Sequence, residues 1–193
     1  MLSFVPNRDL GAPGRRVFAA ALVGVCLAGS CAHGQDVSPT EVKAAYLYKF
    51  APFVDWPAGA FNGYSGPFSI CVVGPDPFGT VLDRVVAGQT VEGKPIVVRR
   101  MPKADKDVVC QVLFAGGTPA QVKDALQVVD GQPVLTVTDG SSPPGVVDFV
   151  TDAGTVHFRL DDEAAAQKKL VISSKLLSLA TAVKRRPAEG GPK

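Results

Sequence analysis

Residues 68–79, with the sequence FSICVVGPDPFG, join a short apolar run to a turn rich in glycine and proline. The uncharged run Phe68–Val73 predicts a buried β-strand. Gly74 ends the run, and Asp76 can cap a helix that continues to about Val86. A strand that turns at once into a helix is the repeating unit of α/β folds.

The same order of strand, glycine turn and helix recurs further along the chain. Val108–Phe114 predicts a strand that carries Cys110, and the sequence GGTP at 116–119 then begins a helix that runs to about Val128. In that turn the glycines let the chain reverse, the threonine caps the helix and the proline suits its first position. Two more strands are predicted, at Ile96–Arg99 and Val134–Val137.

A β-hairpin is predicted in the C-terminal third, where Val146–Thr151 and Thr155–Leu160 flank a short turn at 152–154. Further helices are expected after the capping-box sequence SPTE at 38–41, at Glu163–Lys169 and at Ser174–Val183. The sequence therefore predicts a single-domain α/β fold, with a layered mixed sheet, flanking helices, and a C-terminal β-hairpin followed by helices.

The N-terminus has the layout of a secretory signal peptide. Arg15 and Arg16 precede the uncharged run Val17–Gly29, and the sequence AHG at 32–34 offers small residues to signal peptidase. We therefore expect export to the periplasm by a cleavable signal.

Three regions follow from that expectation: a signal peptide at 1–34, a domain at 35–184 and a flexible, Pro/Gly-rich tail at 185–193. Two alternatives for export remain. Residues 28–31 resemble a lipoprotein box, and residues 15–18 resemble the core of a twin-arginine signal.

The expected mature chain is electrically neutral. The whole chain has 20 Lys+Arg and 18 Asp+Glu, and the signal removes three basic residues and one acidic residue, which leaves 17 of each. Nucleic-acid binders usually carry a strongly basic face, so no nucleic-acid partner is predicted. No apolar run reaches the roughly 18 residues that span a bilayer.

Export would leave two cysteines, Cys71 and Cys110, in an oxidising compartment. Such a pair predicts one structural disulfide, which would close a loop of about 40 residues. The alternative is a redox-active or metal-binding pair, although the 38 intervening residues exclude a CxxC motif.

The mature chain lacks a convincing catalytic or metal-binding set. His157 is its one histidine, and strand alternation places it on a polar face. A catalytic zinc needs about three protein ligands, which this inventory does not supply. Thr80 and Val81 stand where a P-loop requires Lys and Ser/Thr. The sequence therefore predicts no catalytic residue, no metal and no cofactor.

Two groups of residues are candidates for binding. The first lies in loops at the carboxyl ends of predicted strands, where open α/β sheets bind ligands; as an anion or small-ligand site it comprises Gly74, Asp76, Gly116 and Gly117. The second is aliphatic, and as a docking surface for a protein partner it comprises Leu170, Ile172, Leu176 and Leu177.

Several ordered blocks of this sequence resemble the YfiR-like periplasmic proteins. The N-terminal blocks are EVKAAYLYKF at 41–50, VDWP at 54–57, ICVVGPDPFG at 70–79 and CQVLF at 110–114. The C-terminal blocks are GVVDF at 145–149, VHF at 156–158 and LVISSKLL at 170–177. The resemblance runs from about Glu41 to Val183 and so covers nearly all of the expected domain.

This resemblance implies a regulator rather than an enzyme. Proteins of the YfiR type repress an inner-membrane diguanylate cyclase through its periplasmic sensor, which lowers cyclic-di-GMP and biofilm formation, and an outer-membrane lipoprotein can sequester them. The resemblance also implies that the partner can be another sensor protein in place of a diguanylate cyclase, and that the regulator itself forms a homodimer. Cys71 and Cys110 match family cysteine positions, and the absence of a second pair favours a structural bridge. A periplasmic small-ligand-binding protein that uses the strand-end loops is the alternative function.

Overall fold

An eight-stranded mixed sheet forms the centre of the computed structural model, which describes residues 37–61, 66–107 and 109–187. The predicted signal peptide, and residues 188–193 of the predicted tail, lie outside the described residues. In chain order the strands of this sheet are β2 (Phe68–Val73), β3 (Thr90–Val91), β4 (Lys94–Met101), β5 (Val112–Ala115), β6 (Leu135–Asp139), β7 (Val147–Asp152), β8 (Thr155–Asp161) and β10 (Ala182–Lys184).

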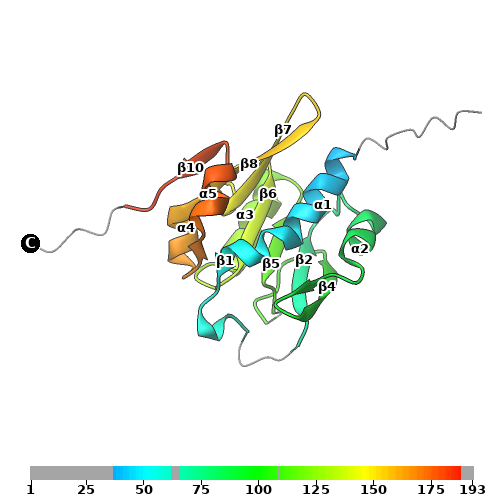
Figure 1. Cartoon of the computed structure of the whole chain (residues 1–193), viewed down its shortest axis with the longest axis horizontal. Helices are drawn as coiled ribbons and strands as arrows, with labels where there is room; N and C mark the ends of the chain where they lie inside the picture. Colours follow the sequence, from blue (N-terminus) through cyan, green and yellow to red (C-terminus); the bar gives the residue numbers. More distant parts are fainter. Residues whose placement is uncertain (1–36, 62–65, 108, 188–193) are drawn as a thin grey trace, which may run out of the picture. The chain divides into compact units, whose positions relative to one another are not determined.

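The strands lie in the order β10-β8-β7-β6-β5-β2-β4-β3 (Figure 1). Neighbours from β4 to β7 are parallel, whereas β8 returns antiparallel to β7 as the predicted hairpin. A separate two-stranded sheet pairs β1 (Val54–Asp55) antiparallel with β9 (Val171–Ile172). The predicted mixed α/β fold is confirmed.

Helices cover the two faces of the large sheet unequally. The helices are α1 (Pro39–Lys49), α2 (Thr80–Val86), α3 (Pro119–Val128), α4 (Asp162–Gln167) and α5 (Ser174–Leu179), with 3-10 turns at Ala51–Phe53 and Ala58–Phe61. Ile70 and Val72 share the larger apolar core with α1, α2, α4 and α5. Their neighbours Cys71 and Val73 point to the opposite face, where they pack with α3.

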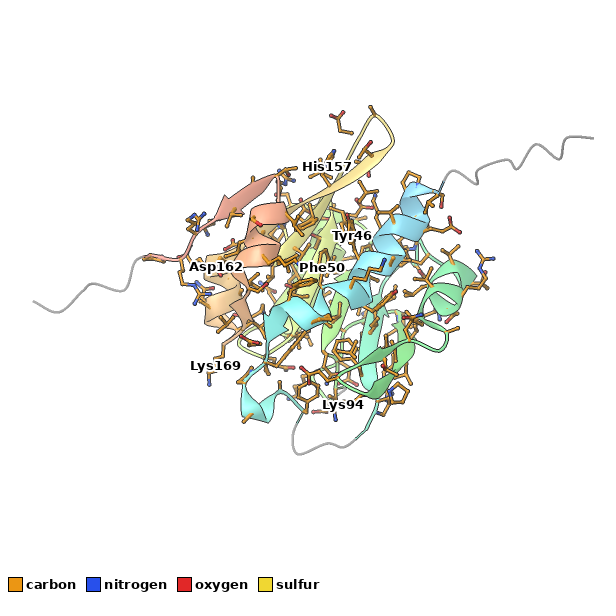
Figure 2. The ribbon with its side chains drawn as sticks, in the orientation of Figure 1. Tyr46, Phe50, Lys94, His157, Asp162 and Lys169 are labelled. Carbon is orange, nitrogen blue, oxygen red and sulfur yellow. A yellow bond between two sulfur atoms is a disulfide. The ribbon has the colours of Figure 1, made fainter. Side chains whose placement is uncertain are left out.

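Aromatic rings anchor α1 on the larger core. Tyr46 and Phe50 point from α1 toward the sheet (Figure 2), and their ring centroids lie 5.3 Å apart. Phe50 also packs against Phe149 of β7 and edge-on against Phe158 of β8. The capping box predicted at Ser38 is present in α1, and the predicted cap Thr118 also forms a capping box, with Gln121, at the start of α3.

Three local predictions were wrong. The C-terminal helix ends at Leu179, and Ala182–Lys184 forms β10 because the edge of β8 is open to a partner strand. Cys110 precedes β5 rather than lying within it, since the ladder with β2 begins at Val112. Asp76 does not cap α2, whose N-cap Gly79 has no side-chain bond, because Arg100 and the Phe78 amide engage its carboxylate.

Candidate functional site

The loops after β2 and β5, which carry the predicted ligand residues Gly74, Asp76, Gly116 and Gly117, lie against each other. The chain leaves β2 toward α2 on one face of the sheet and leaves β5 toward α3 on the other. In open α/β sheets such a divergence forms the crevice in which ligands bind.

The backbone itself fills this crevice. A Cβ atom on Gly74 would lie 2.4 Å from the carbonyl oxygen of Gly116, and one on Gly116 would lie 2.5 Å from that of Pro75. Cavities of about 240 and 180 Å³ remain beside the contact. Ligand pockets usually measure about 300–1,000 Å³, so both cavities are small for a ligand.

The polar groups around the crevice already have partners within the chain. Gln121 Oε1 accepts the Thr118 amide, which completes the capping box beside Gly117. Asp76 accepts hydrogen bonds from the Phe78 amide at 2.8 Å and from Arg100 Nε at 2.7 Å. Burial raises the pKa of Asp76, but the bonds from Arg100 and from the Phe78 amide outweigh this and lower it. Asp76 is therefore a fixed carboxylate that ties its loop to β4.

The predicted aliphatic docking residues are mostly internal. Leu170, Ile172 and Leu176 are buried in the larger core, and Leu177 is half-buried against it. Ile172 turns inward because β9 pairs with β1, opposite Val54. This expectation is therefore corrected: the first three side chains hold the C-terminal segment on the core and are not exposed to a partner.

The same segment does expose two other aliphatic side chains. Val171 is 49% exposed and Leu179 is 60% exposed. Together with the half-buried Leu177 they form what we call the β9–α5 surface. Lys175 lies beside it, with Nζ 5.6 Å from the ring centroid of Phe53. These exposed aliphatic side chains are candidate contacts for a protein partner.

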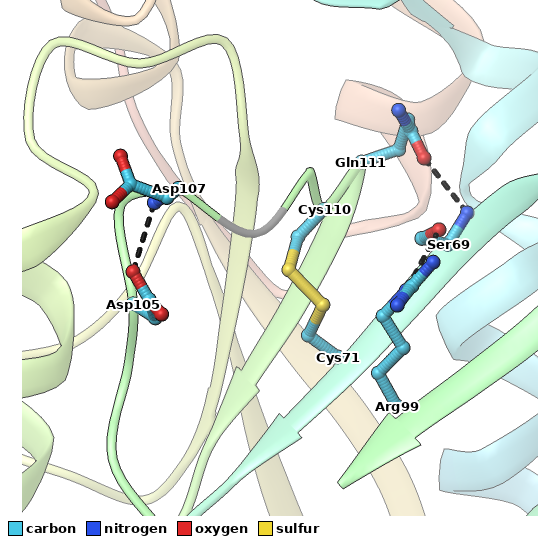
Figure 3. The surroundings of a disulfide bond; sticks show 7 residues. All are labelled: Ser69, Cys71, Arg99, Asp105, Asp107, Cys110 and Gln111. Carbon is cyan, nitrogen blue, oxygen red and sulfur yellow. Dashed lines mark hydrogen bonds between the residues drawn. A yellow bond between two sulfur atoms is a disulfide. The ribbon is translucent and has the colours of Figure 1, made fainter. Parts of the chain in front are cut away.

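The predicted disulfide is present and joins β2 to the segment that leads into β5 (Figure 3). The Cα atoms of Cys71 and Cys110 lie 5.9 Å apart, a usual separation for a bridge. Both residues are buried in the smaller core with Val122 and Ala125 of α3. The bridge is therefore part of the packing beneath α3.

Within the described ranges, no three His, Cys, Asp or Glu residues are grouped closely enough to hold a metal ion. His157 lies half-buried on β8, opposite Val150 of β7. None of the described helices has the length and apolar character needed to cross a membrane.

Comparison with known proteins identifies the family. The profile of YfiR/HmsC-like proteins matches residues 40–181. The chain belongs to the YfiR/HmsC-like family. This family is regulatory rather than catalytic and is periplasmic, which agrees with a disulfide between Cys71 and Cys110.

The remaining comparisons show little or no sequence similarity to this YfiR/HmsC-like chain. Among curated proteins, none matches it. A crystal structure of a conserved domain protein from Vibrio cholerae has a TM-score of 0.49 at 15% identity, over 76% of this chain. The chain spans 60% of the length of that protein.

Proposed function

We propose that the protein is a periplasmic repressor of an inner-membrane signalling enzyme, in the first place a diguanylate cyclase or a related sensor. By binding the periplasmic sensor it lowers cyclic-di-GMP production and biofilm formation. The observation that supports this most is the family match over residues 40–181. An outer-membrane lipoprotein that competes for the repressor, and a homodimeric repressor, belong to the same proposal.

The mechanism is a shift of population. The repressor binds the inactive conformation of the sensor more tightly than the active one, and so raises the inactive fraction. The β9–α5 surface is the contact that we assign to the sensor. Val171 and Leu179 would each remove apolar area from water on docking, and their exposure in the isolated protein supports this assignment.

Deletion of the gene tests the function directly. Cellular cyclic-di-GMP should rise on deletion and return when the gene is restored; unchanged cyclic-di-GMP would contradict the proposal. Capture from solubilised membranes, with the oxidised mature protein as bait, should recover an inner-membrane protein with a diguanylate cyclase output domain.

A further inference from the structure

A groove with charged residues in its lining lies between the β6–β7 connection and the strands β8 and β10. The connection contributes Ser141, Ser142 and Pro144 to its wall, and the strands contribute Arg159 and Lys184. The volume of the groove is about 500 Å³. This lies within the usual range for ligand pockets of about 300–1,000 Å³, unlike the two cavities at the strand ends.

The wall of the groove is held in place by two threonines of β6. Thr138 Oγ1 accepts a hydrogen bond from the Gly145 amide and Thr136 Oγ1 accepts one from the Val146 amide, each at 3.0 Å. A Cβ atom on Gly145 would lie 2.7 Å from the carbonyl oxygen of Thr136, so the connection lies directly against the strand. The wall is thus formed before any ligand arrives.

A buried carboxylate orients Arg159 in the groove. Asp148 is 2% exposed and accepts hydrogen bonds from Thr138 Oγ1 at 2.7 Å and from the Ser141 amide at 3.3 Å. Its other oxygen, Oδ2, lies 2.5 Å from Arg159 Nη2. The Arg159 side chain is 52% exposed, and among the described residues Asp148 is its one hydrogen-bond partner. A guanidinium group has five N–H donors, so most of them remain available in the groove.

The charges of the lining favour a singly charged anion. Lys184 Nζ lies 2.8 Å from Glu163 Oε2 and 3.4 Å from Asp161 Oδ2, so its charge is already shared. Asp148 and Asp161 also line the groove and would repel a second negative charge. A carboxylate matches the planar fork of Arg159 and carries only one charge.

We propose that this groove binds a small molecule through a carboxylate group, with Arg159 as the binding residue and Asp148 as the residue that positions it. The Ser141 and Ser142 hydroxyls provide further hydrogen-bonding groups for the rest of the ligand. The site goes beyond the proposed function, because none of its residues belongs to the β9–α5 surface.

Titration of the oxidised, exported protein tests the proposal. Acetate, propionate and inorganic phosphate are the probes, and amide chemical shifts are the readout. We expect both carboxylates to shift the amides of Ser141, Ser142 and Arg159, and phosphate to bind more weakly. R159Q should weaken carboxylate binding by about tenfold or more, and R159K should bind at an intermediate level because it keeps the charge without the fork.

Arg99→Gln is the matched control. Arg99 is also exposed and its Nε donates to a side chain of the same sheet, Ser69, at 3.5 Å, but it does not line the groove. R99Q should bind carboxylates as the unchanged protein does. The proposal is overturned if neither carboxylate shifts the groove amides, if R159Q binds as well as R99Q, or if phosphate binds at Arg159 more tightly than the carboxylates.

Discussion

Gly74 and Gly116 meet across the carboxyl ends of β2 and β5, so closely that a Cβ on Gly74 would lie 2.4 Å from the carbonyl oxygen of Gly116. Gly74 also has a φ of +79°, which only glycine adopts readily. This contact closes the crevice that parallel sheets usually leave open to ligands. The strand ends therefore serve stability here.

Gly74→Ala should lower the free energy of unfolding by about 2–4 kcal/mol, because the added methyl group meets backbone and also requires a strained φ. Gly88→Ala is the control. Gly88 has a similar φ of +71° but open space around it. Gly88→Ala should therefore cost only the backbone strain of about 1–2 kcal/mol, without a steric clash. Urea denaturation measures both losses. Equal losses would mean that the loops separate easily.

Removal of the disulfide should destabilise the protein strongly. The chain-entropy estimate for a bridge with a sequence separation of 39 residues is about 4 kcal/mol. The double variant Cys71→Ala/Cys110→Ala should therefore unfold at lower urea than the oxidised protein. It should also be insensitive to dithiothreitol, which should weaken only the unchanged protein. Full stability of the variant would contradict a structural role.

In the C-terminal segment, substitution of exposed residues should affect repression, whereas substitution of buried residues should affect stability. Val171→Lys, which faces Asp55 across the strand pair, and Leu179→Asp should raise cyclic-di-GMP while changing the free energy of unfolding by less than about 1 kcal/mol. Leu176→Ala should cost about 2–5 kcal/mol, since the side chain is 2% exposed. Val128→Asp, at another exposed aliphatic residue, should leave cyclic-di-GMP unchanged. Normal repression by both surface variants would remove the β9–α5 surface from the proposal.

Asp162 should make stability depend on pH in the acid range. The hydrogen bonds from Arg186, at 2.7 and 2.8 Å, lower the pKa of Asp162. A carboxyl group with a lowered pKa stabilises the fold above its ordinary pKa of about 3.9 and loses that contribution as the pH falls through the lowered value. Asp162→Asn should therefore cost about 1 kcal/mol at neutral pH, and the cost should shrink below about pH 4.

Urea denaturation at several pH values measures this difference. Asp152→Asn, at the exposed end of β7, is the control for replacing a carboxylate that has no arginine partner among the described residues. A cost for Asp162→Asn that does not change with pH would show that the pair with Arg186 is not its cause.

Thr138→Val should loosen the β6–β7 connection. The variant loses the hydroxyl that accepts the Gly145 amide and donates to Asp148, and leaving these buried groups without a partner costs about 1–3 kcal/mol. Hydrogen exchange of the Gly145 amide should accelerate. Thr181→Val, which removes a hydroxyl bond to the Phe158 carbonyl, is the control and should leave that amide protected.

The sequence predicted elements whose signals are local. The helix caps at Ser38 and Thr118, the strand–turn–helix units and the hairpin predicted at 146–160 depend on neighbouring residues, and all are present. The short strands β1, β9 and β10 were missed because their partners are distant: Val54 pairs with Ile172, and Ala182 pairs with Arg159. Two or three residues give no periodicity of their own.

The candidate sites were also predicted wrongly because they depend on strand pairing, which the local sequence does not show. Pairing with β1 turns Ile172 inward and Val171 outward, which a helical pattern cannot reveal. The groove was missed because Asp148 and Arg159 become neighbours only through the register of β7 with β8. One local signal was available: Asp148 interrupts an apolar run, and a buried carboxylate requires a partner.

The β6–β7 connection joins two parallel strands with residues 140–146 and without a helix. Surface loops generally accept insertions, but here Gly145 and Val146 must each reach a particular threonine. One residue more or fewer would move both amides out of register. In an alignment of relatives that share the groove, gaps should therefore be rare in this segment and should collect instead at the β7–β8 turn, where Asp152–Thr155 is exposed.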